Sequence, residues 1–168
     1  AAYNLGAKNY KRLKKVIKET VIFAFITSAI LWGVSFIYAE EIISLFVKDQ
    51  YLIVESAKAF RVMVAVFPLL SLYYVTIYYY QALGYARTSF LISIFRQLIV
   101  MLPVSLILVK ALDLGALGVW LSYPIADATS SIVSIILIKR AFNRLNGAVE
   151  EEEIQEKRRL GEVGKDMV

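Results

Sequence analysis

The stretch TVIFAFITSAILWGVSFIYA, residues 20–39, contains no charged side chain. An α-helix rises about 1.5 Å per residue, so this stretch reaches about 30 Å, the thickness of the hydrocarbon core of a bilayer. Its apolar residues surround the helix axis, whereas a surface helix of a soluble protein has one apolar stripe. Residues 20–39 therefore predict a helix that crosses a membrane.

Three later stretches have the same character. Residues 62–84 carry no charge, residues 88–109 carry only Arg96, and residues 114–138 carry only Asp127. The remaining charges among 19 Lys and Arg and 14 Asp and Glu residues lie outside the spans. A bilayer imposes this partitioning because it excludes unpaired charge. The sequence predicts an all-α fold, a polytopic membrane helix bundle with four transmembrane helices.

Basic residues flank the spans unequally, which predicts the orientation of the chain. Ten lie beside one set of span ends: Lys8, Lys11, Arg12, Lys14, Lys15, Lys18, Arg87, Lys139, Arg140 and Arg144. The opposite loops carry four, which are Lys48, Lys58, Arg61 and Lys110. Basic residues are enriched on the cytoplasmic side of membrane proteins, so we expect a plasma membrane protein with both ends of the chain in the cytoplasm.

These spans divide the chain into three parts. Residues 1–19 are expected to form a basic cytoplasmic loop or helix, 20–142 the membrane part, and 143–168 a solvated or partly helical cytoplasmic tail. Within the membrane part, residues 40–58 mix apolar and charged residues, which favours short helices at the membrane surface. We interpret the basic N-terminal cluster as a determinant of topology that contacts lipid headgroups, rather than a site for nucleic acid or a specific lipid.

The residue inventory narrows the classes of function. The chain has no Cys and no His, so disulfides, thiol nucleophiles and Cys/His zinc sites are excluded. We recognise no pairing of a nucleophile with a base and no group of metal ligands. The sequence predicts a protein that is not an enzyme and needs neither a bound metal nor an organic cofactor.

Arg96 and Asp127 are the two charges expected at depth. An unpaired charge in the bilayer costs at least about 2.5 kcal/mol, and helical rise puts these residues about 12 and 18 Å from the cytoplasmic ends of their spans. We therefore predict that the two side chains pair, supported by Gln97 or by nearby serines. The pair could be structural or could take part in ion coupling, and both roles stay open.

Serines share the helix faces of the two charges. One face carries Asp127, Ser130, Ser131 and Ser134, and another carries Ser89, Ser93 and Arg96. Residues at these three- and four-residue spacings lie on one side of a helix. Both polar faces are expected to turn away from lipid.

All three prolines, Pro68, Pro103 and Pro124, fall within predicted spans. Proline removes a backbone donor and bends a helix, and membrane helices tolerate this where neighbours satisfy the freed carbonyl. We expect three helix kinks. They could bend as a transporter changes state, or they could reflect the ordinary frequency of proline in membrane helices.

The second span is rich in tyrosine. Tyr78, Tyr79 and Tyr80 lie near the expected membrane surface, where aromatic belts are common. Tyr73 and Tyr74 lie deeper, and together with Gln97 they are candidates for lining a cavity. Aromatic faces attract organic cations.

An ordered set of motifs resembles the multidrug and toxic compound extrusion (MATE) family. The set begins with YNLGAKNYKR at residues 3–12 and ends with GVWLSYPIAD at 118–127. Between them lie Phe67-Pro68, QALG at 81–84, Arg96-Gln97 and Pro103. The resemblance covers about residues 3–142.

This resemblance implies an architecture and a function. MATE proteins have twelve spanning helices in two six-helix lobes, and this chain would supply the last four, in the C-terminal lobe. The family exchanges Na⁺ or H⁺ for amphipathic, often cationic drugs by alternating access, with substrate bound between the lobes. The implied partners are the lipid bilayer, the remaining helices of the same transporter and small organic cations as substrate, with no nucleic acid.

One position departs from the family pattern, and two other functions stay open. Some members carry an ion-coupling carboxylate two residues after the proline that corresponds to Pro68, and here that residue is Leu70. The chain could instead belong to a lipid-linked oligosaccharide flippase of the same superfamily, which is expected to need several basic residues in its cavity. It could also be a complete four-helix scaffold subunit.

Overall fold

A computed structural model describes residues 3, 6–7 and 9–163, which contain helices and no strand. The elements are α2 (Tyr10–Ile37), α3 (Ala39–Ser44), α4 (Gln50–Met63), α5 (Phe67–Ala82), α6 (Ala86–Ile94), η1 (Phe95–Met101), α7 (Leu102–Leu106), η2 (Ile107–Ala111) and α8 (Gly115–Val163), where η marks π-helix. Among the described residues, three helices are long and apolar enough to cross a membrane, or four if α4 and α5 form one bent span. The all-α membrane fold is confirmed.

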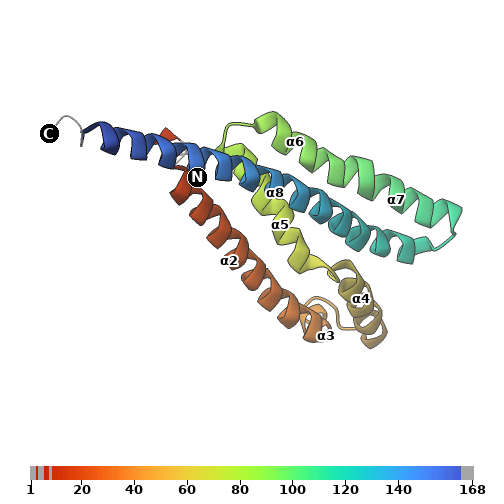
Figure 1. Ribbon diagram of the computed structural model, residues 1–168. Coiled ribbons are helices and arrows are strands. Elements are labelled where there is room, and N and C mark those ends of the chain that lie inside the picture. The colour runs from red at the N-terminus through yellow and green to blue at the C-terminus, as the bar shows by residue number, and fades with distance from the viewer. Residues whose placement is uncertain (1–2, 4–5, 8, 164–168) are drawn as a thin grey trace.

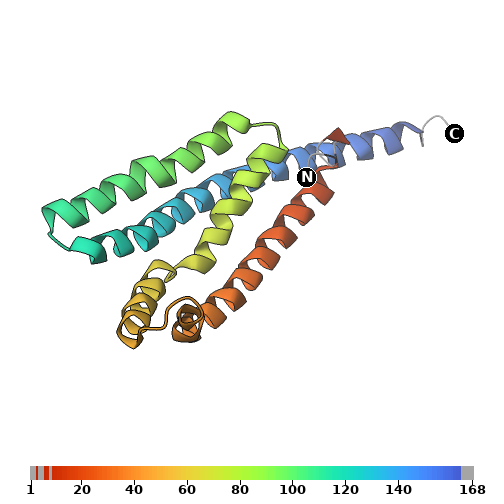
Figure 2. The same ribbon diagram turned by 180° about the vertical axis from the view of Figure 1, so that it is seen from behind.

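The helices form an antiparallel bundle (Figure 1). Helix α5 packs against α2, α6 and α8, and the segment from η1 through α7 to η2 packs along α8. The start of α2 and the far half of α8 lie towards one end of the molecule, and α3 and α4 lie far from it, which the reverse view also shows (Figure 2). We call these the terminal end and the α3–α4 end.

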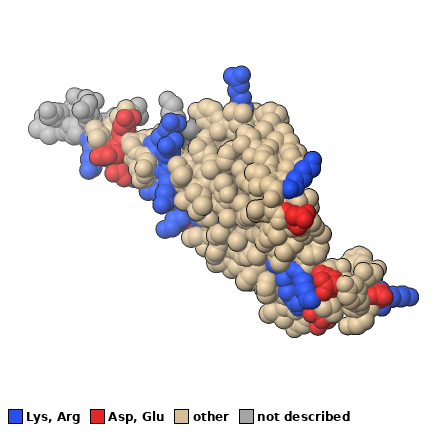
Figure 3. Space-filling view, turned by 90° about the vertical axis from the view of Figure 1, so that its right-hand side faces the viewer, with Lys and Arg blue, Asp and Glu red and all other residues tan. Residues whose placement is uncertain are grey.

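Charged side chains gather towards the ends of the bundle. Figure 3 shows a broad surface without Lys, Arg, Asp or Glu, with charges around the α3–α4 end, near the terminal end and at a few edge positions. Large apolar side chains are exposed on the molecule, among them Phe23, Ile30 and Leu98. A bilayer provides the apolar surroundings that such a surface requires.

Helix α2 begins ten residues before the predicted span. The Asn9 side chain accepts a hydrogen bond from the Arg12 backbone N–H at 3.0 Å, an N-cap that satisfies one of the free donors of the first turn. The basic residues after Asn9 therefore belong to the same helix as the span.

The second span is not the single helix with a kink at Pro68 that was predicted for residues 62–84. Helix α4 ends at Met63, α5 begins at Phe67, and their axes differ by 48°. Pro68 lies in the first turn of α5, where its missing N–H leaves no helical bond unmade. The bend therefore precedes Pro68 and is a break between two helices instead of a kink within one.

The third span contains two π-helical stretches, which the sequence analysis did not anticipate. Segment η1 precedes the short helix α7 and η2 follows it, and Pro103 lies in the first turn of α7. A π-helical turn holds an extra residue, and such turns often occur at functional sites. Irregular helix thus surrounds Pro103, which agrees with the loss of its backbone donor.

Helix α8 runs through the fourth span and beyond it. It contains Pro124 in its interior and continues to Val163, so the tail expected to be solvated or partly helical is helical throughout its described part. A buried cluster joins its far half to α2 and α5: Leu13, Ile17, Tyr79, Ile138, Ala141 and Leu145. This cluster fixes the start of α2 against α8.

Candidate functional site

The buried charges of the third and fourth spans meet inside the bundle. Nε and one terminal nitrogen of Arg96 lie 2.8 and 2.6 Å from Oδ1 of Asp127. The side chains are only 16% and 4% exposed. Hydrogen bonds between ionised groups are among the strongest in proteins, and here they join η1 to α8. The bond satisfies both charges in an environment that penalises either one alone.

Tyr73 extends this site to a third helix. Its ring centroid lies 5.6 Å from the Arg96 guanidinium carbon, within the range of a cation–π interaction. Tyr73 is buried, so it contacts Arg96 within the bundle. Arg96 therefore contacts both α5 and α8.

The serine faces point into the bundle as their spacing predicted. Ser89, Ser130, Ser131 and Ser134 are all buried. Ser131 Oγ donates a hydrogen bond of 2.8 Å to the Leu69 carbonyl oxygen, which ties α8 to the first turn of α5. This bond offsets the free energy that desolvation of the Ser131 hydroxyl costs.

The other predicted cavity residues do not join this centre. Tyr74 is exposed and lines a cavity of about 360 Å³ between α2 and α5. Gln97 is exposed and borders a separate hollow of about 260 Å³ along η1 and α7. The structure thus divides the predicted residues among a buried ionic centre and two surface cavities.

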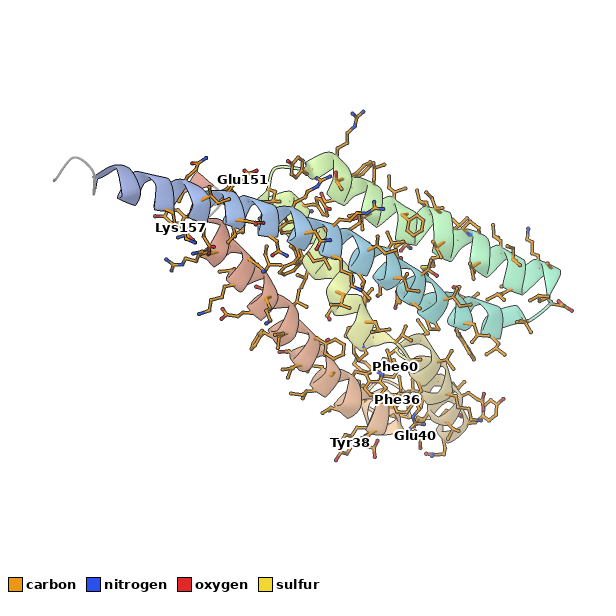
Figure 4. The ribbon with its side chains drawn as sticks, in the orientation of Figure 1. Phe36, Tyr38, Glu40, Phe60, Glu151 and Lys157 are labelled. Carbon is orange, nitrogen blue, oxygen red and sulfur yellow. The ribbon has the colours of Figure 1, made fainter. Side chains whose placement is uncertain are left out.

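At the α3–α4 end, a second arginine connects two helices. Arg61 Nε donates to the Phe36 carbonyl oxygen at 3.1 Å, and a terminal nitrogen lies 3.1 Å from Glu40 Oε1. Figure 4 shows Phe36, Glu40 and Phe60 close together in this region. Sequence reasoning missed this contact because it counted Arg61 only as a loop charge.

The terminal end has an ion pair of its own, between Lys11 Nζ of α2 and Glu153 Oε1 of α8 at 2.8 Å. Glu153 lies well beyond the predicted span, on the extension of α8 where Figure 4 labels Glu151 and Lys157. The hydrogen bond and charge of Lys11 lower the pKa of Glu153 below its ordinary value. This ion pair joins the start of α2 to the extension of α8.

The described residues hold no group of three or more Asp or Glu side chains that could bind a metal ion. Their arrangement instead offers a buried ion pair, bent and π-helical spans, and apolar cavities. These features define a multi-pass membrane protein whose helices pack around charge.

Comparison with known proteins gives the family. The family model MatE matches residues 1–107. The probable multidrug resistance protein YoeA of Bacillus subtilis (strain 168) is 28% identical over 133 residues, which is 79% of this chain and 29% of YoeA. The chain belongs to the MatE family, and it spans less than a third of the length of this curated relative.

Solved structures agree with this assignment. The MATE multidrug transporter DinF-BH, solved in complex with R6G, matches 82% of this chain and 30% of its own, with 31% identity and a TM-score of 0.76. An inward-facing multidrug resistance transporter of the MATE family matches in fold, with a TM-score of 0.79 and 21% identity over 87% of this chain and 34% of its own. Both of these solved relatives are MATE transporters.

Proposed function

We propose that this chain is the C-terminal part of a cation-coupled antiporter that exports amphipathic, often cationic drugs by alternating access. The observation that carries the proposal is the match to DinF-BH, which combines 31% identity with a shared fold over most of this chain. The remaining helices of the transporter and the lipid bilayer would surround the bundle. Small organic cations would be the substrate.

The ionic centre supports a transporter because it joins three helices through side chains alone and leaves their backbones unconnected. Arg96 contacts side chains on two other helices, and η1 and the α4–α5 break give the connected spans irregular backbone. Alternating access requires helices that stay packed while they tilt. In this proposal the centre holds the third and fourth spans together while the break lets α5 change its angle to α4.

The coupling ion is Na⁺ or H⁺ in this proposal, and its carboxylate lies elsewhere in the protein. Asp127 Oδ1 already accepts two hydrogen bonds from Arg96, whose positive charge disfavours a second cation beside it. Leu70, at the position where other members carry a carboxylate, is buried among Tyr73, Ile77 and Ile92. We therefore assign the Arg96–Asp127 pair a structural role.

The proposed orientation places the terminal end in the cytoplasm and the protein in the plasma membrane. The basic residues of α2 and the extension of α8 support it, because both lie at the terminal end. Protease digestion of sealed right-side-out vesicles should leave the α8 extension intact. Cleavage of the extension would show that the terminal end faces the outside, which contradicts the proposed orientation.

Efflux from vesicles tests the function. The full-length protein would be reconstituted with a fluorescent cationic dye, and imposed Na⁺ and H⁺ gradients would be compared separately. We expect dye export under one gradient and none without a gradient. Absence of dye movement under both gradients, with correctly folded protein, would refute drug–cation antiport.

A further inference from the structure

Two adjoining cavities form a groove between α2 and α5, which we call the α2–α5 groove. Their volumes are about 230 and 360 Å³, and both are lined by Thr20, Val75 and Tyr78. The groove begins at Val16, near the start of α2, and extends along that helix to Ser28. Its lining is almost entirely apolar, so a polar ligand gains little from entering it.

The dimensions of the groove suit a lipid chain in one leaflet. Twelve residues separate Val16 from Ser28, which is about 18 Å of helix. One leaflet contributes about half of the ~30 Å hydrocarbon core. About 6 Å of this length precedes the predicted span, which begins at Thr20, and about 12 Å lies within it and reaches towards the middle of the bilayer. An extended chain lying beside α2 would fill this length.

A basic residue stands at the cytoplasmic end of the groove. Arg12 precedes Val16 by four residues and so lies one turn closer to the terminal end on the same face of α2. Its side chain is exposed. Lys15 is paired with Glu19 at 3.8 Å. Lys18 lies nearly opposite Thr20 around the helix, because two residues turn an α-helix by about 200°.

Charge decides which amphiphile fits. An organic cation in the groove would place its charge near Arg12, whereas the phosphate of an anionic lipid would gain charge-assisted hydrogen bonds from the guanidinium. The basic cluster alone predicted only diffuse contact with headgroups. The groove adds a place for the acyl chain of one particular lipid molecule.

We propose that the α2–α5 groove binds an acyl chain of an anionic phospholipid from the cytoplasmic leaflet, with the lipid phosphate held by Arg12. This inference rests on the orientation given under the proposed function. It assigns the groove to a lipid and not to the exported drug. Phosphate on a lipid and free inorganic phosphate share the same chemistry at Arg12, but only the lipid uses the groove.

The test measures lipid binding to the purified full-length protein by native mass spectrometry, with phosphatidylglycerol, phosphatidylcholine or inorganic phosphate added. We expect a bound phosphatidylglycerol that Arg12→Gln weakens about fivefold, the contribution of one basic residue near a membrane surface. The matched control Lys18→Gln removes the same charge from the opposite face and should change binding less than about twofold. Equal losses in both variants would show a diffuse electrostatic field and overturn the proposal.

A second pair of variants tests the groove. Thr20→Trp fills the space shared by both cavities, and Ala24→Phe fills the deeper one if the first variant does not fold. Either folded variant should lose the bound phosphatidylglycerol. Retained binding would show that the lipid does not occupy the groove, which overturns the proposal, as would binding of inorganic phosphate with the same Arg12 dependence.

Two further measurements separate this inference from the proposed function. Competition by a cationic dye for bound phosphatidylglycerol would make the groove a drug site and overturn the lipid assignment, while leaving drug transport intact. Dye efflux measured on the same preparations reports the proposed function directly. Loss of lipid binding with normal efflux would therefore refute only the lipid site.

Discussion

Replacement of Gly118 by alanine tests how closely α8 approaches the third span. A Cβ atom at Gly118 would lie 2.9 Å from the Leu108 carbonyl carbon and 3.0 Å from the Val109 nitrogen. Ordinary van der Waals contact begins near 3.4 Å, so the helices must separate by about 0.5 Å or strain locally. The opposing atoms include backbone, which cannot rotate away as a side chain end can.

The expected cost follows from two opposing terms. Overpacking a close contact costs about 1–3 kcal/mol, and alanine returns up to about 1 kcal/mol of helix propensity. We expect Gly118→Ala to lower the free energy of unfolding by about 1–2 kcal/mol. The matched control is Gly33→Ala in α2, where nothing lies within 4 Å of the added Cβ, so only the propensity gain remains.

The assay is reversible unfolding of the full-length protein in mixed micelles, titrated with a denaturing detergent. The two alanine variants should move the midpoint in opposite directions, or Gly33→Ala should leave it unchanged. A stability of Gly118→Ala equal to that of Gly33→Ala would refute the close approach of α8 to η2.

Three further outcomes follow from the structure. Arg96→Met or Asp127→Leu alone should lower the free energy of unfolding in mixed micelles by about 3–5 kcal/mol, because each leaves an unpaired buried charge. The double variant should recover most of that loss. Equal losses in both single variants and the double variant would contradict direct pairing. Gly84→Ala should cost about 1 kcal/mol, since φ is +81° and open space surrounds the position, so a neutral result would contradict that backbone conformation. The contact with Lys11 lowers the carboxyl pKa of Glu153, so it stabilises the folded state at neutral pH and is lost as the pH falls through that lowered pKa. Protection of the α8 extension against hydrogen exchange, measured relative to the intrinsic exchange rate at each pH, should fall with pH in the wild type and should already be low at neutral pH in Glu153→Gln.

The features of the fold that the bilayer imposes could be predicted from the sequence. A helix that crosses a bilayer needs a long run of residues without charge, so the four spans could be recognised directly in the sequence. The same constraint predicted that Arg96 and Asp127 must meet, because each is costly alone and both lie at similar depth. Serine spacing showed which faces of these helices turn inward.

Features that depend on neighbouring backbones could not be predicted. The break before Phe67 lies in uniformly apolar sequence, and the π-helical turns around Pro103 have a composition that a regular helix could equally have. The approach of Gly118 to Leu108 requires knowledge of which helices touch. Proline positions did indicate where regular helix fails, but did not distinguish a kink from a break.

Because α8 extends far beyond the fourth span, a small tilt of that span moves the far end of the helix over a long distance. From residue 138 to Val163 the helix reaches about 37 Å past the predicted span, at 1.5 Å per residue. A tilt of about 10° within the membrane would therefore swing its far end by about 6 Å. Because Leu145 and Ala141 are buried against Leu13 of α2, the first and last long helices must share much of that swing, so motion of one side of the bundle is carried to the other outside the bilayer.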